Sequence, residues 1–202
     1  GATPFVRCSH LAVDRAAGAS VALAIVIDDS QSMRAVGSGN VRSRFEQAKA
    51  GALQLLDSAR EGDAIAVIGA GSSARLLLNA TTDLTSARQV IAGLDVTDRA
   101  TDLSSAVALA RAALKELPHA DKRVALLSDQ HDKPVPGGQP ALWIPLPDLA
   151  KPAANCGIAE AVRAGNEVAV SVGCSNQEAA TNQRALLEQR IDVLGRLQLQ
   201  SR

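Results

Sequence analysis

Oxygen-bearing side chains occupy alternate positions at the end of a buried segment, in residues 27–33, which read IDDSQSM. Asp28, Ser30 and Ser32 lie two residues apart, so they can turn into one crevice where the chain leaves the segment. Hard oxygen donors of this kind bind Mg²⁺, Mn²⁺ or Ca²⁺, whereas zinc and copper prefer imidazole and thiolate groups, which are missing here. The stretch therefore predicts a divalent-cation site, and the residues between the donors are expected to face elsewhere: Asp29, Gln31 and Met33.

Further oxygen donors are expected at the same place in the fold. Thr101, followed by Asp102, stands at the start of a predicted helix, and Asp129 ends a predicted strand. In a parallel sheet the carboxyl ends of the strands lie along one edge, and ligands bind in the crevice beyond it. The candidate cation ligands are therefore Asp28, Ser30, Ser32, Thr101 and Asp129.

Strands and helices alternate along the chain, which predicts an α/β fold with a doubly wound, mostly parallel sheet and helices on both faces. The continuous apolar run of residues 21–27 is typical of a central strand buried on both faces. The capping box SRFE at residues 43–46 begins a helix that Gly62 stops. Further strands are predicted at residues 63–69 and 74–79, which form a hairpin, and at 123–129 and 141–146; further helices are predicted at 85–94 and 101–117.

The texture of the sequence changes beyond Pro147. GIAEAV at residues 157–162 and EVAVSVG at 167–173 flank the turn-like RAGN, which predicts a β-hairpin. In residues 177–202 no periodicity decides between a helix and a pair of strands. The predicted organisation is an N-terminal arm at residues 1–19, a main domain at 20–148 and a β-rich extension at 149–202.

The motif around the candidate ligands resembles a known family. Asp-x-Ser-x-Ser-Met after a buried strand, a later Thr-Asp before a helix and a strand-ending Asp are similar to the metal-ion-dependent adhesion site of the von Willebrand factor type A domain, a Rossmann-like fold. The resemblance covers residues 20–146 and implies that the five candidates surround a Mg²⁺, or a Mn²⁺ or Ca²⁺. It also implies cation-dependent protein binding without turnover. Because neutral hydroxyls outnumber carboxylates, the cation keeps positive character, and an acidic residue of a protein partner can complete its coordination.

The chain departs from the family pattern at several positions. Arg99 and Ala100 precede Thr101 where the family often has Gly, and Gln130 and His131 follow Asp129 where it often has Gly. The segment with NCGIAEAV and EVAVSVGCS is similar to bacterial membrane-anchored members of the Bat, aerotolerance-type group. That similarity, together with a first residue that is not Met, leads us to expect a membrane anchor in the full-length protein.

Composition narrows the range of functions. The 21 basic residues balance the 21 acidic ones, and there are only two Phe, one Trp and no Tyr, so we expect no nucleic-acid partner. Cys8, Cys156 and Cys174 match no metal-ligand spacing and allow at most one internal disulfide. No apolar run reaches the roughly 18 to 20 residues that span a bilayer, so we expect this domain to be soluble.

Two enzymatic interpretations and one structural interpretation compete with the binding module. VIGAGSSA at residues 67–74 contains the Gly-x-Gly-x-x-Ala of a dinucleotide-binding turn, but RLLLNATTD after it is too short and too rich in breakers for the required helix. A Mg²⁺-dependent phosphatase of the haloacid dehalogenase type needs a second carboxylate two residues after Asp28, where Ser30 stands. We therefore expect no enzyme. A metal-free structural scaffold is the remaining alternative, and cation-dependent thermal stabilisation distinguishes the two.

Overall fold

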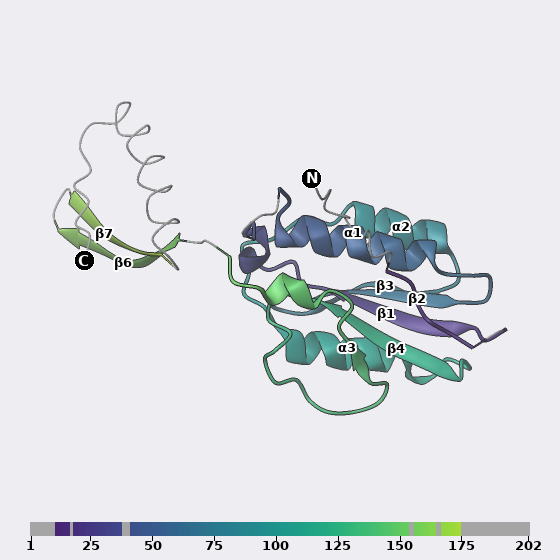
Figure 1. Ribbon diagram of the computed structural model, residues 1–202. Coiled ribbons are helices and arrows are strands. Elements are labelled where there is room, and N and C mark those ends of the chain that lie inside the picture. The colour runs from purple at the N-terminus through teal and green to yellow at the C-terminus, as the bar shows by residue number, and fades with distance from the viewer. Residues whose placement is uncertain (1–10, 17, 38–40, 154–155, 165–166, 175–202) are drawn as a thin grey trace, which may run out of the picture. The chain divides into compact units, whose positions relative to one another are not determined.

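The computed structural model describes residues 11–16, 18–37, 41–153, 156–164 and 167–174 (Figure 1). The chain folds into two compact units. Residues 1–34 and 42–151 form the first unit, and residues 35–41 and 152–202 form the second.

The first unit is built on a five-stranded sheet with the strand order β3-β2-β1-β4-β5. All neighbouring strands run parallel except β3, which pairs antiparallel with β2. The order reverses on either side of β1, which is the arrangement of a doubly wound sheet. The strands are β1 (Val21–Ile27), β2 (Ala64–Gly69), β3 (Arg75–Thr81), β4 (Asp121–Leu127) and β5 (Leu142–Trp143).

Helices cover both faces of this sheet (Figure 1). The helices α1 (Arg44–Asp57) and α2 (Leu84–Ala92) pack on one face, and α3 (Leu103–Lys115) packs on the other. Two short 3₁₀ helices, η1 (Gln31–Arg34) and η2 (Pro147–Ala150), follow β1 and β5. The α/β fold with a mostly parallel, doubly wound sheet is confirmed.

The central strand β1 explains why the two layers hold together. All seven of its residues are buried, and they alternate between two cores. Its larger side chains face α1 and α2, whereas Ala22, Ala24 and Val26 face α3. Small residues on that second face, together with Ala106 and Ala110 of α3, let the helix approach the sheet closely. The two cores therefore fix the position of the carboxyl end of β1 from both faces of the sheet.

The capping box at residues 43–46 forms as the sequence predicts. Glu46 N–H donates to Ser43 Oγ at 3.1 Å, and Ser43 N–H donates to Glu46 Oε2 at 2.7 Å. The backbone bond to Ser43 holds the pKa of Glu46 below its usual value. This cap sets the first turn of α1 and hence the position of Arg44.

Removing the cap should destabilise the domain modestly. Ser43→Ala deletes the hydroxyl that accepts from the helix N-terminus, and we expect the free energy of unfolding to fall by about 1 kcal/mol. Urea unfolding followed by the fluorescence of Trp143, the single tryptophan, measures the change. Ser43→Asp preserves an acceptor and should stay close to the parent; equal losses in both variants would contradict the capping role.

The hairpin of β2 and β3 excludes the dinucleotide-binding turn. Gly69 ends β2, and Arg75 begins an antiparallel strand where that unit requires a helix. The predicted strand at residues 141–146 is shortened to β5, since Pro145 and Pro147 lack the N–H that a ladder needs.

The second unit contains a two-stranded antiparallel sheet of β6 (Cys156–Ala164) and β7 (Glu167–Cys174). The predicted hairpin is therefore present, and the register pairs Cys156 with Cys174. The ambiguous residues 177–202 lie outside the described part of the chain.

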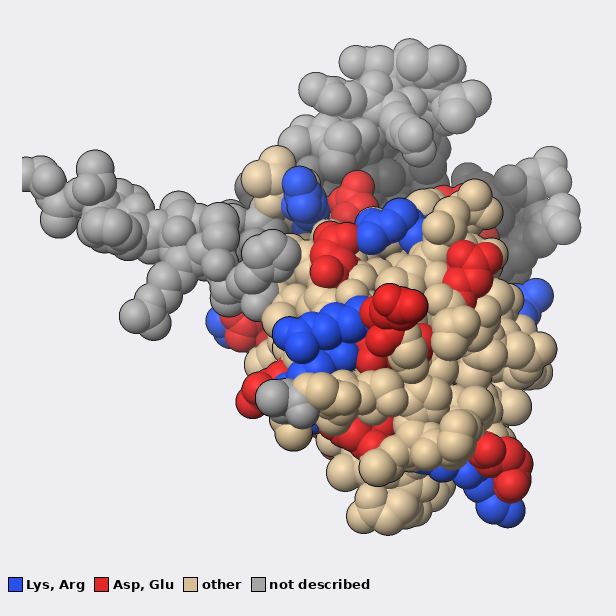
Figure 2. All heavy atoms as spheres, turned by 90° about the vertical axis from the view of Figure 1, so that its right-hand side faces the viewer, with Lys and Arg blue, Asp and Glu red and all other residues tan. Residues whose placement is uncertain are grey.

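The surface of the first unit carries charges of both signs. Figure 2 shows one face, on which Lys and Arg lie interspersed with Asp and Glu. Such a face offers no extended field of one sign for a polyanion. In the described part of the chain, no helix combines the length and the apolar character that a bilayer crossing requires.

Candidate cation site

The polar cluster predicted from the sequence forms where β1 and β4 end. Asp28 N–H donates to Leu127 O at 3.0 Å and Ala70 N–H donates to Ile27 O at 2.9 Å, so the three parallel strands remain paired up to the cluster. The 3₁₀ helix η1 begins at Gln31, shortly after β1 ends at Ile27. The cluster thus lies at the point where the strand order reverses, the usual ligand position in doubly wound sheets.

Thr101 reaches the cluster because the loop before α3 is bound to the strand ends by main-chain hydrogen bonds. Gln31 N–H donates to Arg99 O at 3.0 Å, and Ser72 N–H donates to Ala100 O at 2.7 Å. An isolated bridge pairs Gly71 with Thr101. These bonds hold the loop in place without the glycine that is common in the family pattern.

All five candidate ligands come together. Thr101 Oγ1 donates to Ser30 Oγ at 2.8 Å, the hydroxyl oxygens of Ser30 and Ser32 lie 3.2 Å apart, and Ser32 Oγ donates to Asp129 Oδ1 at 3.0 Å. Asp28 Oδ1 accepts from Ser30 N–H at 3.0 Å. Two carboxylates and three hydroxyls from three separate segments therefore form one continuous hydrogen-bonded group.

Asp28 lies at the buried base of this group. Its side chain is fully buried, and Ser128 Oγ donates to Asp28 Oδ2 at 2.6 Å. Desolvation raises the pKa of Asp28 above its ordinary value, although hydrogen bonds from Ser128 and Ser30 oppose this rise. The negative form of this carboxylate is thus incompletely compensated by the protein.

Three other carboxylates in the first unit are similarly buried, and each has an arginine. Asp29 pairs with Arg75, Asp63 with Arg15 and Asp129 with Arg44. Among the ion pairs of the described residues, none involves Asp28. A buried carboxylate ordinarily needs a cationic partner. Asp28 therefore differs from these three carboxylates, because no basic side chain of the described part pairs with it.

Arg44 connects Asp129 to the start of α1. Its NH1 group lies 2.7 Å from Asp129 Oδ2, and its NH2 group donates to Lys151 O at 2.6 Å. Both charged side chains are largely buried. Arg44 therefore holds the outer carboxylate oxygen of Asp129, while the inner oxygen accepts from Ser32.

Sequence reasoning missed two residues beside the predicted ligands, in addition to Arg44. Ser128, the last residue before Asp129, donates to Asp28, and its position at a strand end is a signal that could have identified it. The side chain of Gln130 reaches across the cluster, where its Nε2 donates to Thr101 Oγ1 at 3.0 Å and to Ser32 Oγ at 3.2 Å. From the sequence, Gln130 was only a departure from the family's glycine.

Asp29 faces away from the cluster, as the sequence predicts. It is nevertheless buried, because it pairs with Arg75 and accepts from Gly71 N–H at 2.7 Å. A Cβ at Gly71 would lie 2.8 Å from Asp29 Oδ1, so glycine permits this close approach. Met33 is buried in the core, as expected for a packing residue. Asp29 therefore fastens the turn between β2 and β3 to the end of β1.

The donor set fits a hard divalent cation. It offers only oxygen, and no group of three or more His, Cys, Asp or Glu side chains with metal-binding geometry occurs among the described residues. Mg²⁺ and Mn²⁺ keep several water ligands, so a site with two carboxylates and several hydroxyls suits them. Loops that bind Ca²⁺ tightly usually provide more carboxylates than this site does. The phosphatase interpretation requires a second carboxylate where Ser30 stands. The Ser30 side chain is instead hydrogen-bonded to the hydroxyls of Thr101 and Ser32.

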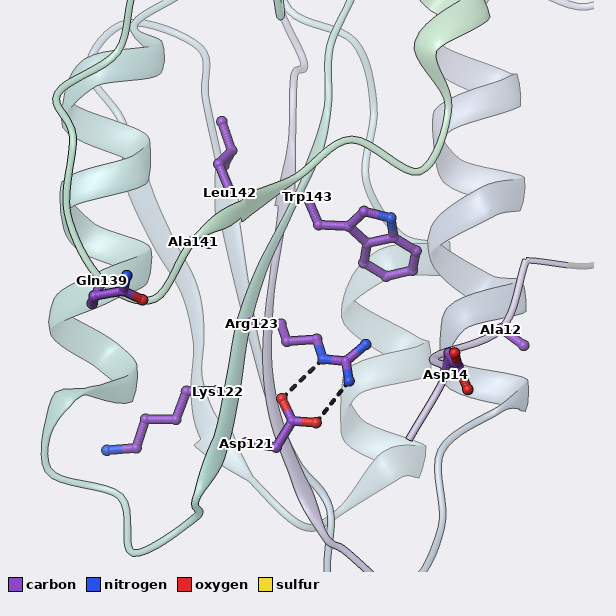
Figure 3. Close-up of a pocket in the computed structure, with 9 residues that line it drawn as sticks. All are labelled: Ala12, Asp14, Asp121, Lys122, Arg123, Gln139, Ala141, Leu142 and Trp143. Atoms are coloured by element: carbon purple, nitrogen blue, oxygen red, sulfur yellow. Dashed lines mark hydrogen bonds and ion pairs between the residues drawn. The ribbon is translucent and has the colours of Figure 1, made fainter. Parts of the chain in front are cut away.

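A separate hollow of about 400 Å³ lies at the amino end of β4, opposite the end that carries Asp129 (Figure 3). Arg123 forms a two-bond ion pair with Asp121, with distances of 2.9 and 2.7 Å. Hydrogen bonding from Arg123 lowers the pKa of Asp121. This pair is satisfied within the protein, so the hollow offers less ligand chemistry than the cluster around Asp28.

Comparison with known proteins identifies the fold. The model of the von Willebrand factor type A domain matches residues 23–131, just over half of the 202-residue chain. No match was found among curated proteins.

Several solved structures resemble the chain. BatB from Bacteroides thetaiotaomicron has 17% sequence identity and a TM-score of 0.52, covering 86% of this chain and 98% of that one. An aerotolerance-related membrane protein from Bacteroides fragilis has 19% identity and a TM-score of 0.52, covering 86% and 99%. At these identities the likeness is one of fold. Three N-terminal domains of the type V pili tip protein Mfa5 from Porphyromonas gingivalis have 27% identity and a TM-score of 0.47 over 55% of this chain, which spans only 20% of that structure.

Proposed function

The chain belongs to the von Willebrand factor type A domain family, and we propose that it is a protein-binding module whose binding depends on a divalent cation. Domains of this family are in general protein-interaction modules. The observation that carries the proposal is the fully buried Asp28 carboxylate, which has no basic partner in the described part of the chain and adjoins four other oxygen donors. In this proposal Asp28, Ser30, Ser32, Thr101 and Asp129 hold Mg²⁺, or Mn²⁺ or Ca²⁺.

The charges around the cluster favour an acidic partner. Arg44 already neutralises much of the charge of Asp129, so Asp28 is the main uncompensated anion. A divalent cation beside one uncompensated carboxylate and three neutral hydroxyls leaves net positive charge at the site. When bound, the cation would supply a Lewis-acidic position that an Asp or Glu of a partner protein can fill. A metal-free scaffold would have no such position.

Cation binding is the first test of this proposal. Because binding to the folded state alone raises stability, Mn²⁺ at 100 times its dissociation constant should add about 2.7 kcal/mol and raise the melting temperature. Isothermal titration with Mn²⁺ should show one site, and Ser30→Ala should weaken it at least about tenfold. Ser104→Ala, which removes an exposed hydroxyl on α3, is the matched control and should bind as the parent does. No heat of binding and no thermal shift with either Mn²⁺ or Mg²⁺ would reject the proposal in favour of the scaffold.

The partner chemistry is tested on the Mn²⁺-loaded protein. Acetate should displace water from the bound ion and reduce the relaxation enhancement of water protons, whereas acetamide should not. Loss of acetate binding in Ser30→Ala and its retention in Ser104→Ala would tie the effect to this site. An equal response to acetate and acetamide would contradict carboxylate recognition. Hydrolysis of a generic phosphate ester that depends on Asp28 would instead favour the phosphatase interpretation.

A further inference from the structure

The side-chain amide of Gln130 lies against two of the proposed cation ligands. Its Nε2 is 3.0 Å from Thr101 Oγ1 and 3.2 Å from Ser32 Oγ. The main chain of the same residue is also fixed, because Gln130 N–H donates to Ser128 Oγ at 3.0 Å. Ser128 in turn donates to Asp28. Gln130 is thus connected to the cluster through both its backbone and its side chain.

The number of hydrogens available to Ser32 and Thr101 explains why the NH₂ group of the Gln130 amide faces these two hydroxyls. Each hydroxyl has one hydrogen to donate. Thr101 donates to Ser30, and Ser32 donates to Asp129. Neither hydroxyl has a hydrogen left for an amide oxygen, so both can only accept from Gln130. The two N–H bonds of the amide therefore serve one hydroxyl each.

The oxygen of Ser32 lies within hydrogen-bonding distance of two further groups, Ser30 Oγ and Gln130 Nε2. Its hydrogen points to Asp129, so Ser32 can only accept in the 3.2 Å contact with Ser30, whose single hydrogen also serves Asp28. One lone pair of Ser32 accepts from Gln130, whereas Ser30 can direct its hydrogen to Asp28 instead of Ser32. A cation that binds Ser32 therefore competes with the positively polarised N–H group of Gln130 for the same oxygen. Gln130 is the donor that is not itself a proposed ligand.

We infer that Gln130 is an internal competitor of the cation: its amide NH₂ holds Ser32 and Thr101 in the cation-free protein and opposes the binding of a cation to the same two oxygens. The inference rests on the proposed function of the site. It predicts that the residue stabilises the cation-free site while lowering the affinity for the cation. Removing the amide should therefore lower the stability of the cation-free protein and raise its affinity for the cation. A purely structural role for Gln130 would lower the stability without raising the affinity.

Gln130→Met tests this inference, because methionine keeps a side chain of similar length and removes both N–H donors. In chelator-treated protein the melting temperature should fall by about 2–4 °C, the shift expected for roughly 1 kcal/mol in a domain of this size. In calorimetric titration the variant should bind Mn²⁺ about tenfold more tightly, since the cation no longer displaces a hydrogen-bonded amide. Gln89→Met, at an exposed position of α2, should change neither quantity.

The possible outcomes separate this inference from the proposed function. If the parent binds Mn²⁺ and Gln130→Met binds it within twofold of the parent, Gln130 is no competitor. Weaker Mn²⁺ binding by the variant would also overturn the inference and would identify Gln130 as a ligand through its amide oxygen. If neither protein binds Mn²⁺, the proposed function and this inference fail together. Tighter binding with a lower cation-free melting temperature supports both.

Discussion

Asp28→Asn is expected to make the cation-free protein more stable while abolishing its response to Mn²⁺ and Mg²⁺. The Asp28 carboxylate is fully buried, and no basic side chain of the described part pairs with it. Asparagine has the same shape and can still accept from Ser30 N–H, while its NH₂ group donates to Ser128 Oγ in place of the bond that the carboxylate accepts, and the desolvated charge is removed. We expect a gain of about 1 kcal/mol in the free energy of unfolding, the usual scale when a residue kept for function is replaced. Urea unfolding with and without Mg²⁺ measures both effects.

The neighbouring carboxylate provides a matched control. Asp29 is equally buried, but Arg75 and Gly71 N–H satisfy it. Asp29→Asn weakens that ion pair and should therefore destabilise the protein, while the gain in stability with Mg²⁺ is retained. If Asp28→Asn were as destabilising as Asp29→Asn without cation, the charge of Asp28 would be compensated inside the protein, and the central argument for a cation site would be lost.

Asp63→Ala should produce the largest loss of stability, about 3–5 kcal/mol, because it leaves a buried arginine without its partner. Arg15 NH1 lies 2.8 and 2.6 Å from the two carboxylate oxygens of Asp63, and both side chains are almost completely buried. The carboxylate also accepts from Val21 N–H and Arg60 N–H, both at 2.8 Å. Its loss would free three donors at the amino end of β1. Asp57→Ala, which breaks the exposed pair with Arg88, should change stability by no more than about 0.5 kcal/mol.

The same carboxylate should make stability depend on pH. Desolvation alone would raise the pKa of Asp63, but hydrogen bonds from Val21, Arg15 and Arg60 outweigh it, so the pKa lies below its ordinary value. The stabilisation is therefore complete above the unfolded-state pKa of about 3.9 and is lost as the pH falls through the lower folded-state pKa. The stability difference between the parent and Asp63→Ala should shrink over that acidic range. A difference that stays constant would contradict the role of the charge.

Local signals in the sequence were sufficient for most of the fold. The apolar run of β1 and the capping box of α1 depend on neighbouring residues, so their positions could be predicted closely. Element ends were less predictable. The helix predicted from residue 101 begins at Leu103, because Asp102 uses its side chain to accept from Ser105 N–H as the cap. The loop before α3 determines that Asp102 acts as the helix cap.

The part of the cluster that could be predicted from the sequence is the part whose oxygen-bearing residues recur at every second position. Asp28, Ser30 and Ser32 could be proposed as neighbours from their alternation alone. Arg44 could not, since it meets Asp129 across 85 residues and the capping box that contains it does not specify the residue at this position. Gln130 was visible only as a departure, because its contact with Ser32, 98 residues away, depends on how two loops meet. Residues that support a site through long-range contacts leave no local pattern to read.

The separation of the three segments around the cluster has a consequence for the order of folding. Ser30 and Thr101 are 71 positions apart, Ser32 and Asp129 are 97 apart, and Asp28 and Ser128 are 100 apart. Closing loops of this length costs chain entropy before any of these contacts can form. Asp129 and Ser128 can therefore join the other donors only after β4 has paired with β1. A cation bound as proposed would thus recognise the assembled sheet, and it would act by slowing unfolding.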